Sequence, residues 1–156
     1  MQLKTSPLSI SEIRNGTVID HIDAGKGLLI VKLLKLDLTS KKVLIGLNLP
    51  ASSMGYKDII KLEDRELSEE EANQLAILSS KITINIVKNL EIQKKFKLSI
   101  PNQIENVIIC PNIKCITNFE KVSTLFFVHQ RSHSIQLRCK YCENVFMQEK
   151  LKTTYS

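Results

Sequence analysis

The sequence predicts an α+β protein built from two parts, and three observations carry this prediction. Runs of β-branched and apolar residues alternate with two helix-like stretches as far as residue 98. Pro101 then interrupts regular structure. All four cysteines lie beyond this proline, in two close pairs. We therefore expect one domain over residues 1–100 and a second over residues 101–156.

The first domain is predicted to contain five strands. Because β-branched and apolar residues favour strands, we place these at residues 17–22, 42–47, 57–62, 83–87 and 90–98. Pro50 and Gly55 predict a loop over residues 48–55, between the second and third strands. Lys88 and Asn89 predict a turn before the last strand.

Two helices separate these strands. Apolar spacing predicts the first over residues 28–36. The second begins at Ser68, because Ser68 and Glu71 have the spacing of a capping box, and its apolar stripe runs to Leu78. The order strand-helix-strand-strand-helix-strand-strand is a ferredoxin-like α/β sandwich with one extra strand, in which two helices cover one face of an antiparallel sheet. We expect the other face to be open and rich in isoleucine, and therefore to bind a second copy of the chain.

The second domain is predicted to be a small all-β unit. Residues 122–128 and 134–137 resemble strands of an antiparallel sheet. Its core is expected to contain the phenylalanines Phe119, Phe126, Phe127 and Phe146. With roughly 55 residues, such a unit is near the size at which an apolar core alone is marginal.

The cysteines predict a metal site that makes up for this small core. Their spacing is Cys-x₄-Cys followed by Cys-x₂-Cys, and two such pairs on short loops can place four sulfur atoms at the corners of a tetrahedron, as structural Zn²⁺ requires. Four protein ligands leave no position for water, so the ion would be structural and not catalytic. An iron–sulfur cluster also uses four cysteines, but well-separated pairs fit a zinc ribbon better. The predicted ligands of one Zn²⁺ per chain are Cys110, Cys115, Cys139 and Cys142.

Two histidines are possible rival ligands. His129 and His133 lie between the cysteine pairs at a spacing that resembles a histidine pair. Since the four sulfurs already satisfy the ion, we expect both histidines to lie at the surface or in loops.

Composition limits the possible functions further. The chain of 156 residues carries a net charge of +6 and is 43% hydrophobic, and it shows neither a secretory leader nor the ~20 apolar residues of a membrane span. We expect a cytoplasmic protein with reduced cysteines. An enzyme is disfavoured, because no Ser/His/Asp set, open metal position or Gly-rich phosphate loop is present. The basic charge leaves one alternative, a nucleic-acid-binding zinc-ribbon protein with a dimerising N-terminal domain.

Several longer runs are similar to the family of aspartate carbamoyltransferase regulatory chains. The runs Gly16-Thr-Val-Ile-Asp-His-Ile22 and Gly46-Leu-Asn-Leu-Pro50 are specific in combination with this cysteine pattern. Further matching stretches are Met54–Lys61, Leu67–Glu69, Asn106–Asn112, Cys115–Ile116 and Cys139–Glu143.

The resemblance implies a non-catalytic subunit with two domains. Its N-terminal domain would bind allosteric nucleotides and mediate dimerisation, and its zinc domain would dock on the catalytic chain. Family enzymes join two catalytic trimers through three regulatory dimers. ATP activates them, whereas CTP, with UTP in some members, inhibits. The controlled reaction is carbamoyl transfer to aspartate, which commits carbon to pyrimidines. Neither a nucleic acid nor a membrane is implied as a partner.

The resemblance also assigns residues by position. Family roles place the ribose near Asp20 and Lys61, the phosphates near His21, Lys57 and Lys95, and the base near backbone groups of Ile13 and Leu90. The full expected nucleotide set is Ile10, Ser11, Glu12, Ile13, Asp20, His21, Lys57, Lys61, Asn85, Val87, Leu90, Ile92 and Lys95. The expected contacts with the catalytic chain are Asn112, Arg131, Lys140 and Glu143.

Strand geometry places one condition on the nucleotide set. Lys57 and Lys61 are four residues apart, so on a strand they face the same side. Asp20 and His21 are adjacent, so on a regular strand they would face opposite sides. Both can reach one ligand only near a strand end or an edge.

Overall fold

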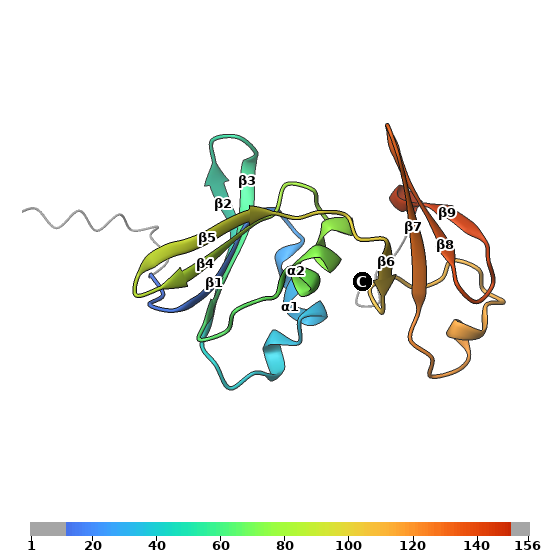
Figure 1. Ribbon diagram of the computed structural model, residues 1–156, viewed down its shortest axis with the longest axis horizontal. Coiled ribbons are helices and arrows are strands. Elements are labelled where there is room, and N and C mark those ends of the chain that lie inside the picture. The colour runs from blue at the N-terminus through green and yellow to red at the C-terminus, as the bar shows by residue number, and fades with distance from the viewer. Residues whose placement is uncertain (1–11, 151–156) are drawn as a thin grey trace, which may run out of the picture.

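The computed structural model describes residues 12–150 (Figure 1). Ile10 and Ser11 of the expected nucleotide set lie outside the described residues. Within residues 12–150, no helix is long and apolar enough to cross a membrane.

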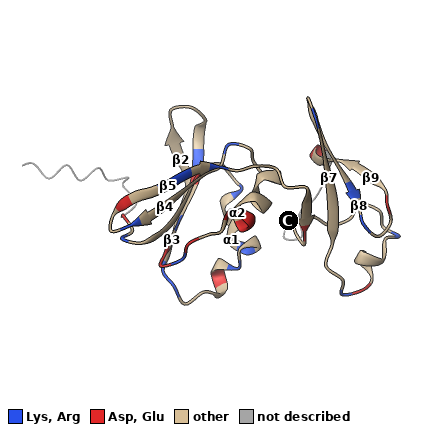
Figure 2. Ribbon diagram, in the orientation of Figure 1, with Lys and Arg blue, Asp and Glu red and all other residues tan. Residues whose placement is uncertain are grey.

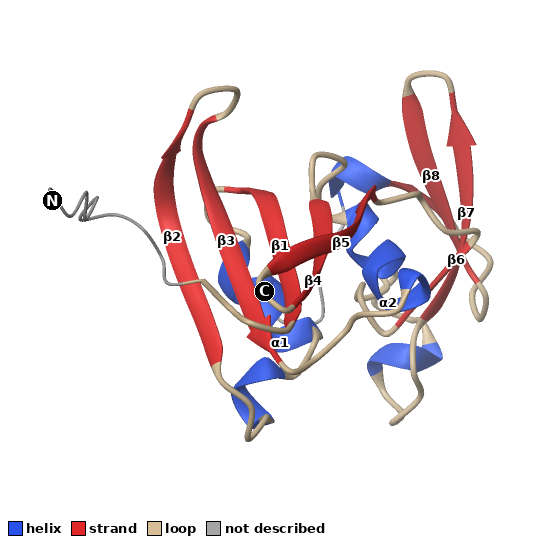
Figure 3. Cartoon of the chain, turned by 60° about the vertical axis from the view of Figure 1, so that its left-hand side comes forward, coloured by secondary structure: helices blue, strands red, loops and turns tan. Residues whose placement is uncertain are grey.

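The first part of the chain forms the predicted antiparallel sheet with two helices. Five strands lie in the order β2-β3-β1-β4-β5, with every neighbouring pair antiparallel. Both helices lie on one face (Figures 1 and 3). The strands are β1 (Gly16–Asp23), β2 (Val43–Ala51), β3 (Gly55–Glu63), β4 (Thr83–Lys88) and β5 (Glu91–Lys97). The helices are α1 (Gly27–Leu33) and α2 (Glu69–Gln74), followed by the 3₁₀ turns η1 (Leu36–Leu38) and η2 (Leu75–Ile77). Because β3 lies between β1 and β2, the ferredoxin-like prediction is confirmed.

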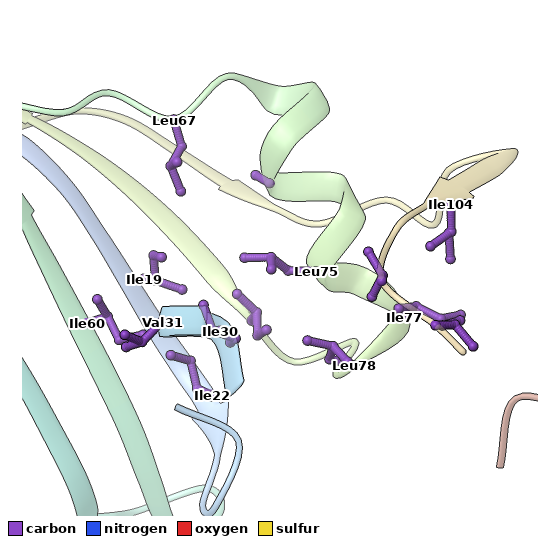
Figure 4. Close-up of a cluster of buried hydrophobic side chains, with 14 of the residues drawn as sticks. Ile19, Ile22, Ile30, Val31, Ile60, Leu67, Leu75, Ile77, Leu78 and Ile104 are labelled. Carbon is purple, nitrogen blue, oxygen red and sulfur yellow. The ribbon is translucent and has the colours of Figure 1, made fainter. Parts of the chain in front are cut away.

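The core lies between this sheet and the helices (Figure 4). Ile60, Ile19 and Ile84 are paired in register on β3, β1 and β4, and all three are fully buried. Ile30 of α1 and Leu75 of η2 belong to the same apolar cluster. Burial of each such side chain contributes roughly 1.5–3 kcal/mol, so this layer accounts for much of the stability of the sheet.

The expectation that the face opposite the helices is rich in isoleucine is wrong. Side chains alternate along a strand, so the buried isoleucine row leaves the next row on the opposite face. That row contains Lys61, Val18, Asn85 and Lys95 in register on β3, β1, β4 and β5. The face opposite the helices is therefore partly basic and polar.

The helices follow their predicted starts but end early. The Ser68 hydroxyl accepts a hydrogen bond from the Glu71 N–H, and the Glu71 carboxylate accepts one from the Ser68 N–H, which confirms the capping box. The predicted first helix stops at Leu33 because Lys35 has a positive φ of 53°. The second becomes a 3₁₀ turn from Leu75 to Ile77.

The predicted loop over residues 48–55 is instead a long hairpin. β2 continues to Ala51 and β3 begins at Gly55. A bulge makes this possible: the pairing shifts between Gly46 and Leu49, and Asn48 has a φ of 57°. Proline at position 50 is tolerated because β2 is an edge strand.

The second part forms an antiparallel sheet of four strands in the order β6-β7-β8-β9. The predicted strand at 122–128 begins later, at Leu125, and the one at 134–137 is confirmed and runs on to Cys139. Phe126 is fully buried, whereas Phe119 is 72% exposed, so its expected core position is wrong. The elements are β6 (Gln103–Glu105), β7 (Leu125–Arg131), β8 (Ser134–Cys139) and β9 (Val145–Met147), with η3 (Ile116–Asn118) and η4 (Gln148–Lys150).

The α2 helix ties the two sheets together. The Gln74 side chain donates to the Gln103 carbonyl and accepts from the Glu105 N–H, both at 3.3 Å, as a neighbouring strand would do at the free edge of β6. The preceding residue, Asn73, accepts the Ser99 N–H at 2.9 Å. Ile104 of β6 belongs to the same buried cluster as the residues of η2 (Figure 4). The joint expected at residues 99–103 is therefore fixed to the first domain.

Candidate functional site

The four cysteine side chains meet at one end of the second sheet. Their sulfur atoms all lie within 4.8 Å of one another, and they form the one such group of three or more potential metal ligands in residues 12–150. The Cys110–Cys142 and Cys115–Cys139 sulfur pairs are 3.6 and 3.8 Å apart. A disulfide would need about 2.05 Å, whereas a tetrahedron with Zn–S bonds of about 2.3 Å has sulfurs about 3.8 Å apart. The geometry therefore fits one four-coordinate zinc ion.

The loops around the cysteines hold the sulfurs in place. The Thr117 hydroxyl donates to the Cys115 sulfur at 3.2 Å. The Asn118 side chain donates to the carbonyls of Cys110 and Asn112, at 3.1 and 2.8 Å, and so closes the first cysteine loop. Such outer hydrogen bonds orient metal ligands and tune their charge.

The electrostatics of the thiols couple metal binding to proton release. Burial raises the pKa of the Cys110 and Cys139 thiols above the ordinary value, so these groups resist ionisation without a cation. The pKa of the Cys115 thiol is instead lowered to about 7. Burial alone would raise this pKa, but hydrogen bonds from the Thr117 hydroxyl and backbone N–H outweigh that effect. Zinc binds thiolates, so binding would release protons from this cage.

The rival histidines lie away from the metal cage. His129 and His133 are exposed, and neither belongs to the ligand cluster. His129 is paired with Gln136 three positions along β7 from the Phe126–Cys139 pair. The four cysteines therefore form the metal site without a histidine.

A second candidate site lies on the sheet face opposite the helices. β1 contains a bulge, because Asp20 and His21 together occupy the position opposite a single residue of β3. His21 has a φ of 55°, and its Nδ1 atom lies 2.9 Å from the Thr83 hydroxyl and 3.9 Å from the Asp20 carboxylate. The condition set by strand geometry is thus met by a bulge: both side chains belong to one cluster.

Lys57 completes this cluster from β3. Its ammonium group lies 2.8 Å from the Asp20 carboxylate, and both side chains are about four-fifths buried. Lys61, Asn85 and Lys95 share one row on the same face. With strands about 4.8 Å apart, this row spans about 14 Å from β3 to β5, and basic residues recur along β5 (Figure 2). The surface therefore presents several cations and one buried amide over the length of an extended polyanion.

The turn between β4 and β5 brings in the N-terminal segment. Asn89 and Leu90 both have positive φ angles, of 52° and 68°, as the tight hairpin turn requires. The Leu90 N–H donates to the Arg14 carbonyl, so the turn lies beside the residue that follows Ile13. Ile13 is buried and Glu12 is exposed, while Val87 is buried and Ile92 is 60% exposed. Ile13 and Leu90 are thus brought close together, but the Leu90 N–H already has a backbone partner.

The Asp20–Lys57 pair gives a testable pH dependence. Burial alone would raise the pKa of Asp20, but the Lys57 ammonium and the His21 N–H outweigh it, and the pKa is lowered. A lowered carboxyl pKa stabilises the fold above its unfolded value, and this contribution is lost as the pH falls. We expect Asp20→Asn to lose less unfolding free energy than the native chain between about pH 6 and about pH 3. Urea unfolding at each pH measures this, and equal losses in the two chains would contradict it.

Three of the four expected docking residues lie near the metal cage. Asn112 lies in the first cysteine loop, Lys140 lies between the two cysteines of the second pair, and Glu143 follows that pair. Arg131 lies at the opposite end of the β7–β8 hairpin, about 16 Å away along the strand. The structure therefore does not bring Arg131 together with the other three.

Sequence reasoning missed an apolar surface beside the cage. Ile113, Ile116 and Phe119 are 79%, 51% and 72% exposed and lie within one short loop. The sequence did contain a signal for this surface: large apolar residues lie in the short loop after the first cysteine pair begins, and so short a loop cannot bury them. Exposed apolar groups gathered in this way indicate an interaction surface.

Comparison with known proteins gives matches over nearly the whole chain. The family model described as aspartate carbamoyltransferase regulatory chain, allosteric domain, matches residues 8–99, and the model described as the metal binding domain of the same chain matches residues 102–152. Curated proteins named aspartate carbamoyltransferase regulatory chain are similar throughout. The one from Photobacterium profundum is 47% identical, covering 94% of this chain and 95% of the relative. The one from Chromobacterium violaceum is 44% identical, covering 90% and 93%.

Proposed function

Because the chain belongs to the family of aspartate carbamoyltransferase regulatory chains, we propose that it binds nucleoside triphosphates on its first sheet and passes the signal to catalytic chains through its second. It is a regulatory chain and not an enzyme, with a metal-binding domain whose four cysteines can hold one zinc ion. The observation that carries the proposal is the cationic face around the Asp20–Lys57 pair, joined by α2 to the metal-binding sheet. We place the domain boundary near residue 100, and the complex in the cytoplasm.

The chemistry of the first sheet fits a nucleotide. A triphosphate needs several converging cations, which His21, Lys57 and Lys95 supply. Asp20 can accept the hydroxyls of a ribose with help from Lys61. The side-chain oxygen of Asn85 is buried and accepts no hydrogen bond from the described residues, so it is available to a ligand donor. We propose CTP and UTP as inhibitors and ATP as the activator.

The second sheet supplies the surface for the catalytic chain. We propose that Ile113, Ile116 and Phe119 pack against an apolar patch of that chain, with Asn112, Lys140 and Glu143 forming a polar rim. Such an arrangement is ordinary for protein interfaces. Arg131 would belong to a separate contact at the far end of the hairpin.

Dimerisation is proposed at the free edge of β2. This strand is nine residues long and ends the first sheet, so it presents unpaired backbone groups to solvent. Ile45 and Leu47 on it are 40% and 45% exposed, and Tyr56, which lies opposite Pro50 of β2, is exposed as well. A second copy would cover these groups and join regulatory chains in pairs.

Signal transmission would run through α2. The basic sheet face runs from β3 to β5, and on β5 Lys94 pairs with Glu69 at the start of α2. Five residues along, Gln74 holds the edge of β6. A nucleotide can shift the enzyme between states only if it binds them unequally, and typical couplings are about 1–3 kcal/mol.

Mixing this chain with purified catalytic trimer tests the proposal. We expect a larger species by sedimentation, with carbamoyl transfer that falls with CTP and rises with ATP. A Lys57→Met, Lys61→Met double variant is the matched control: it should assemble equally well and lose most of the nucleotide response, because its zinc domain is unchanged. A mixture that assembles but ignores nucleotides would refute the allosteric part, and one that fails to assemble would refute the docking part.

The same preparation addresses the nucleic-acid alternative. A zinc-ribbon protein of that class would bind duplex DNA or RNA with affinity that falls steeply as salt rises. Family membership argues against it, and we expect no such binding in a mobility assay at two salt concentrations.

A further inference from the structure

We propose that the Asp20 carboxylate makes the effector site reject polyphosphates that carry no nucleoside. The inference rests on the proposed function, since it concerns the ligand class of the same site. Asp20 would then have a role in specificity in addition to binding a ribose, because its carboxylate competes with phosphates for the cations of the site.

The first step is that the site already contains an anion against a phosphate-binding lysine. One Asp20 oxygen lies 2.8 Å from the Lys57 ammonium and also accepts a hydrogen bond from the backbone N–H of His21 at 2.6 Å. The other oxygen lies 3.9 Å from the His21 ring. Asp20 and Lys57 are 18% and 21% exposed, so water screens the pair incompletely. Asp20 therefore holds the Lys57 ammonium, one of the groups expected to meet phosphates, and places a negative charge close to the His21 ring, whose Nδ1 atom lies 2.9 Å from the Thr83 hydroxyl.

The second step is the chemistry of what arrives. A phosphate chain that approaches Lys57 must either displace Asp20 from the lysine or share the lysine with it. At such close range the Asp20 carboxylate also repels the phosphate charges. Ionised phosphate oxygens offer no donor to this carboxylate. A nucleotide offers ribose hydroxyls, which donate to Asp20 and release Lys57 for the phosphates. The Asp20 carboxylate thus weakens the binding of bare polyphosphates and strengthens the binding of nucleotides. Specificity between similar ligands arises from such a difference in affinity.

The third step is the choice of a control carboxylate that does not face Lys57. Asp23 is unsuitable, because it lies directly opposite Lys57 where β1 pairs with β3. Asp37 belongs to η1, and its carboxylate lies 2.6 Å from the Lys32 ammonium. Asp37→Asn is therefore the control for a general loss of one negative charge.

The test compares two probes, inorganic tripolyphosphate and CTP, by titration calorimetry on the full zinc-loaded chain. In Asp20→Asn we expect tripolyphosphate to bind about tenfold more tightly than in the native chain, and CTP to gain less or to weaken. The preference for CTP over tripolyphosphate should shrink by about tenfold or more. Asp37→Asn should leave that preference within about twofold of the native value.

Each other outcome decides against a different claim. If Asp20 merely orients Lys57, its removal weakens both probes together, and the inference is overturned while the proposed function stands. If the native chain binds neither CTP nor ATP, the proposed function itself fails. Should Asp20→Asn unfold, as judged by circular dichroism, Asp20→Ser provides the same neutral substitution with a hydroxyl, and an unchanged affinity for tripolyphosphate in that variant also overturns the inference.

Discussion

The Cys139→Ala chain is expected to lose its zinc and to dissociate from the catalytic trimer, while CTP binding on the first sheet persists. Cys139 is fully buried, its sulfur lies 3.8 Å from that of Cys115, and β8 ends at this residue. With three cysteines, a bound zinc ion would lack its fourth protein ligand and the closed site would be lost. Structural zinc binding is worth about 10–16 kcal/mol in small zinc domains at neutral pH, far more than a sheet of four short strands can replace. The loop that carries Ile113 and Phe119 would then lose its shape.

Three measurements on one preparation follow this outcome. Elemental analysis gives zinc per chain, sedimentation with catalytic trimer gives assembly, and calorimetry with CTP gives nucleotide binding. His129→Ala is the control, because His129 is exposed and lies outside the metal cluster, and it should retain one zinc per chain. A Cys139→Ala chain that still holds stoichiometric zinc, or that assembles with normal affinity, would refute the docking model.

The parts of the fold that the sequence predicted correctly depend on local chemistry. The capping box of Ser68 and Glu71 is complete within four residues, so its geometry needs no distant partner. The cysteine pairs likewise carry their own ligand spacing, and the structure places all four sulfurs together. The runs of β-branched and apolar residues placed β1, β3 and β4 within two residues of their observed bounds.

The features that were missed depend on partners far along the chain. The bulge at His21 arises from how β1 pairs with β3, and nothing in the β1 sequence itself specifies an extra residue. The bulge at Asn48 depends on a carboxylate ten residues away. Phe119 was assigned to the core because it is aromatic, but it is 72% exposed in the loop beside the four cysteines. Its exposure makes sense only when a second polypeptide is considered.

Asp58 is the residue whose loss should most reduce the stability of the first domain. Asp58 lies on β3 next to Lys57 and is fully buried. One of its oxygens accepts the N–H groups of Gly25 and Gly27, at 3.0 and 2.9 Å, and the other accepts that of Asn48 at 2.8 Å. One carboxylate therefore fixes the loop after β1, the start of α1 and the bulge of β2. A Cβ atom on Gly27 would lie 2.9 Å from this carboxylate, which shows how closely the backbone approaches it.

Asp58→Ala is expected to lower the unfolding free energy by about 3–5 kcal/mol, because three N–H groups lose their acceptor and each unsatisfied buried group costs about 1–3 kcal/mol. For a chain of this length the melting temperature should fall by about 10 °C or more. Asp58→Asn keeps one carbonyl oxygen but turns an amide donor toward the remaining N–H groups, so we expect about half of that loss. Asp37→Ala removes an exposed carboxylate that pairs with Lys32 and should change the stability by less than about 0.5 kcal/mol. If Asp58→Ala melts within a few degrees of the native chain, the three hydrogen bonds do not organise the β1–α1 loop and the β2 edge as argued. If it melts far lower but still binds CTP when cooled, Asp58 supports the fold without shaping the effector site.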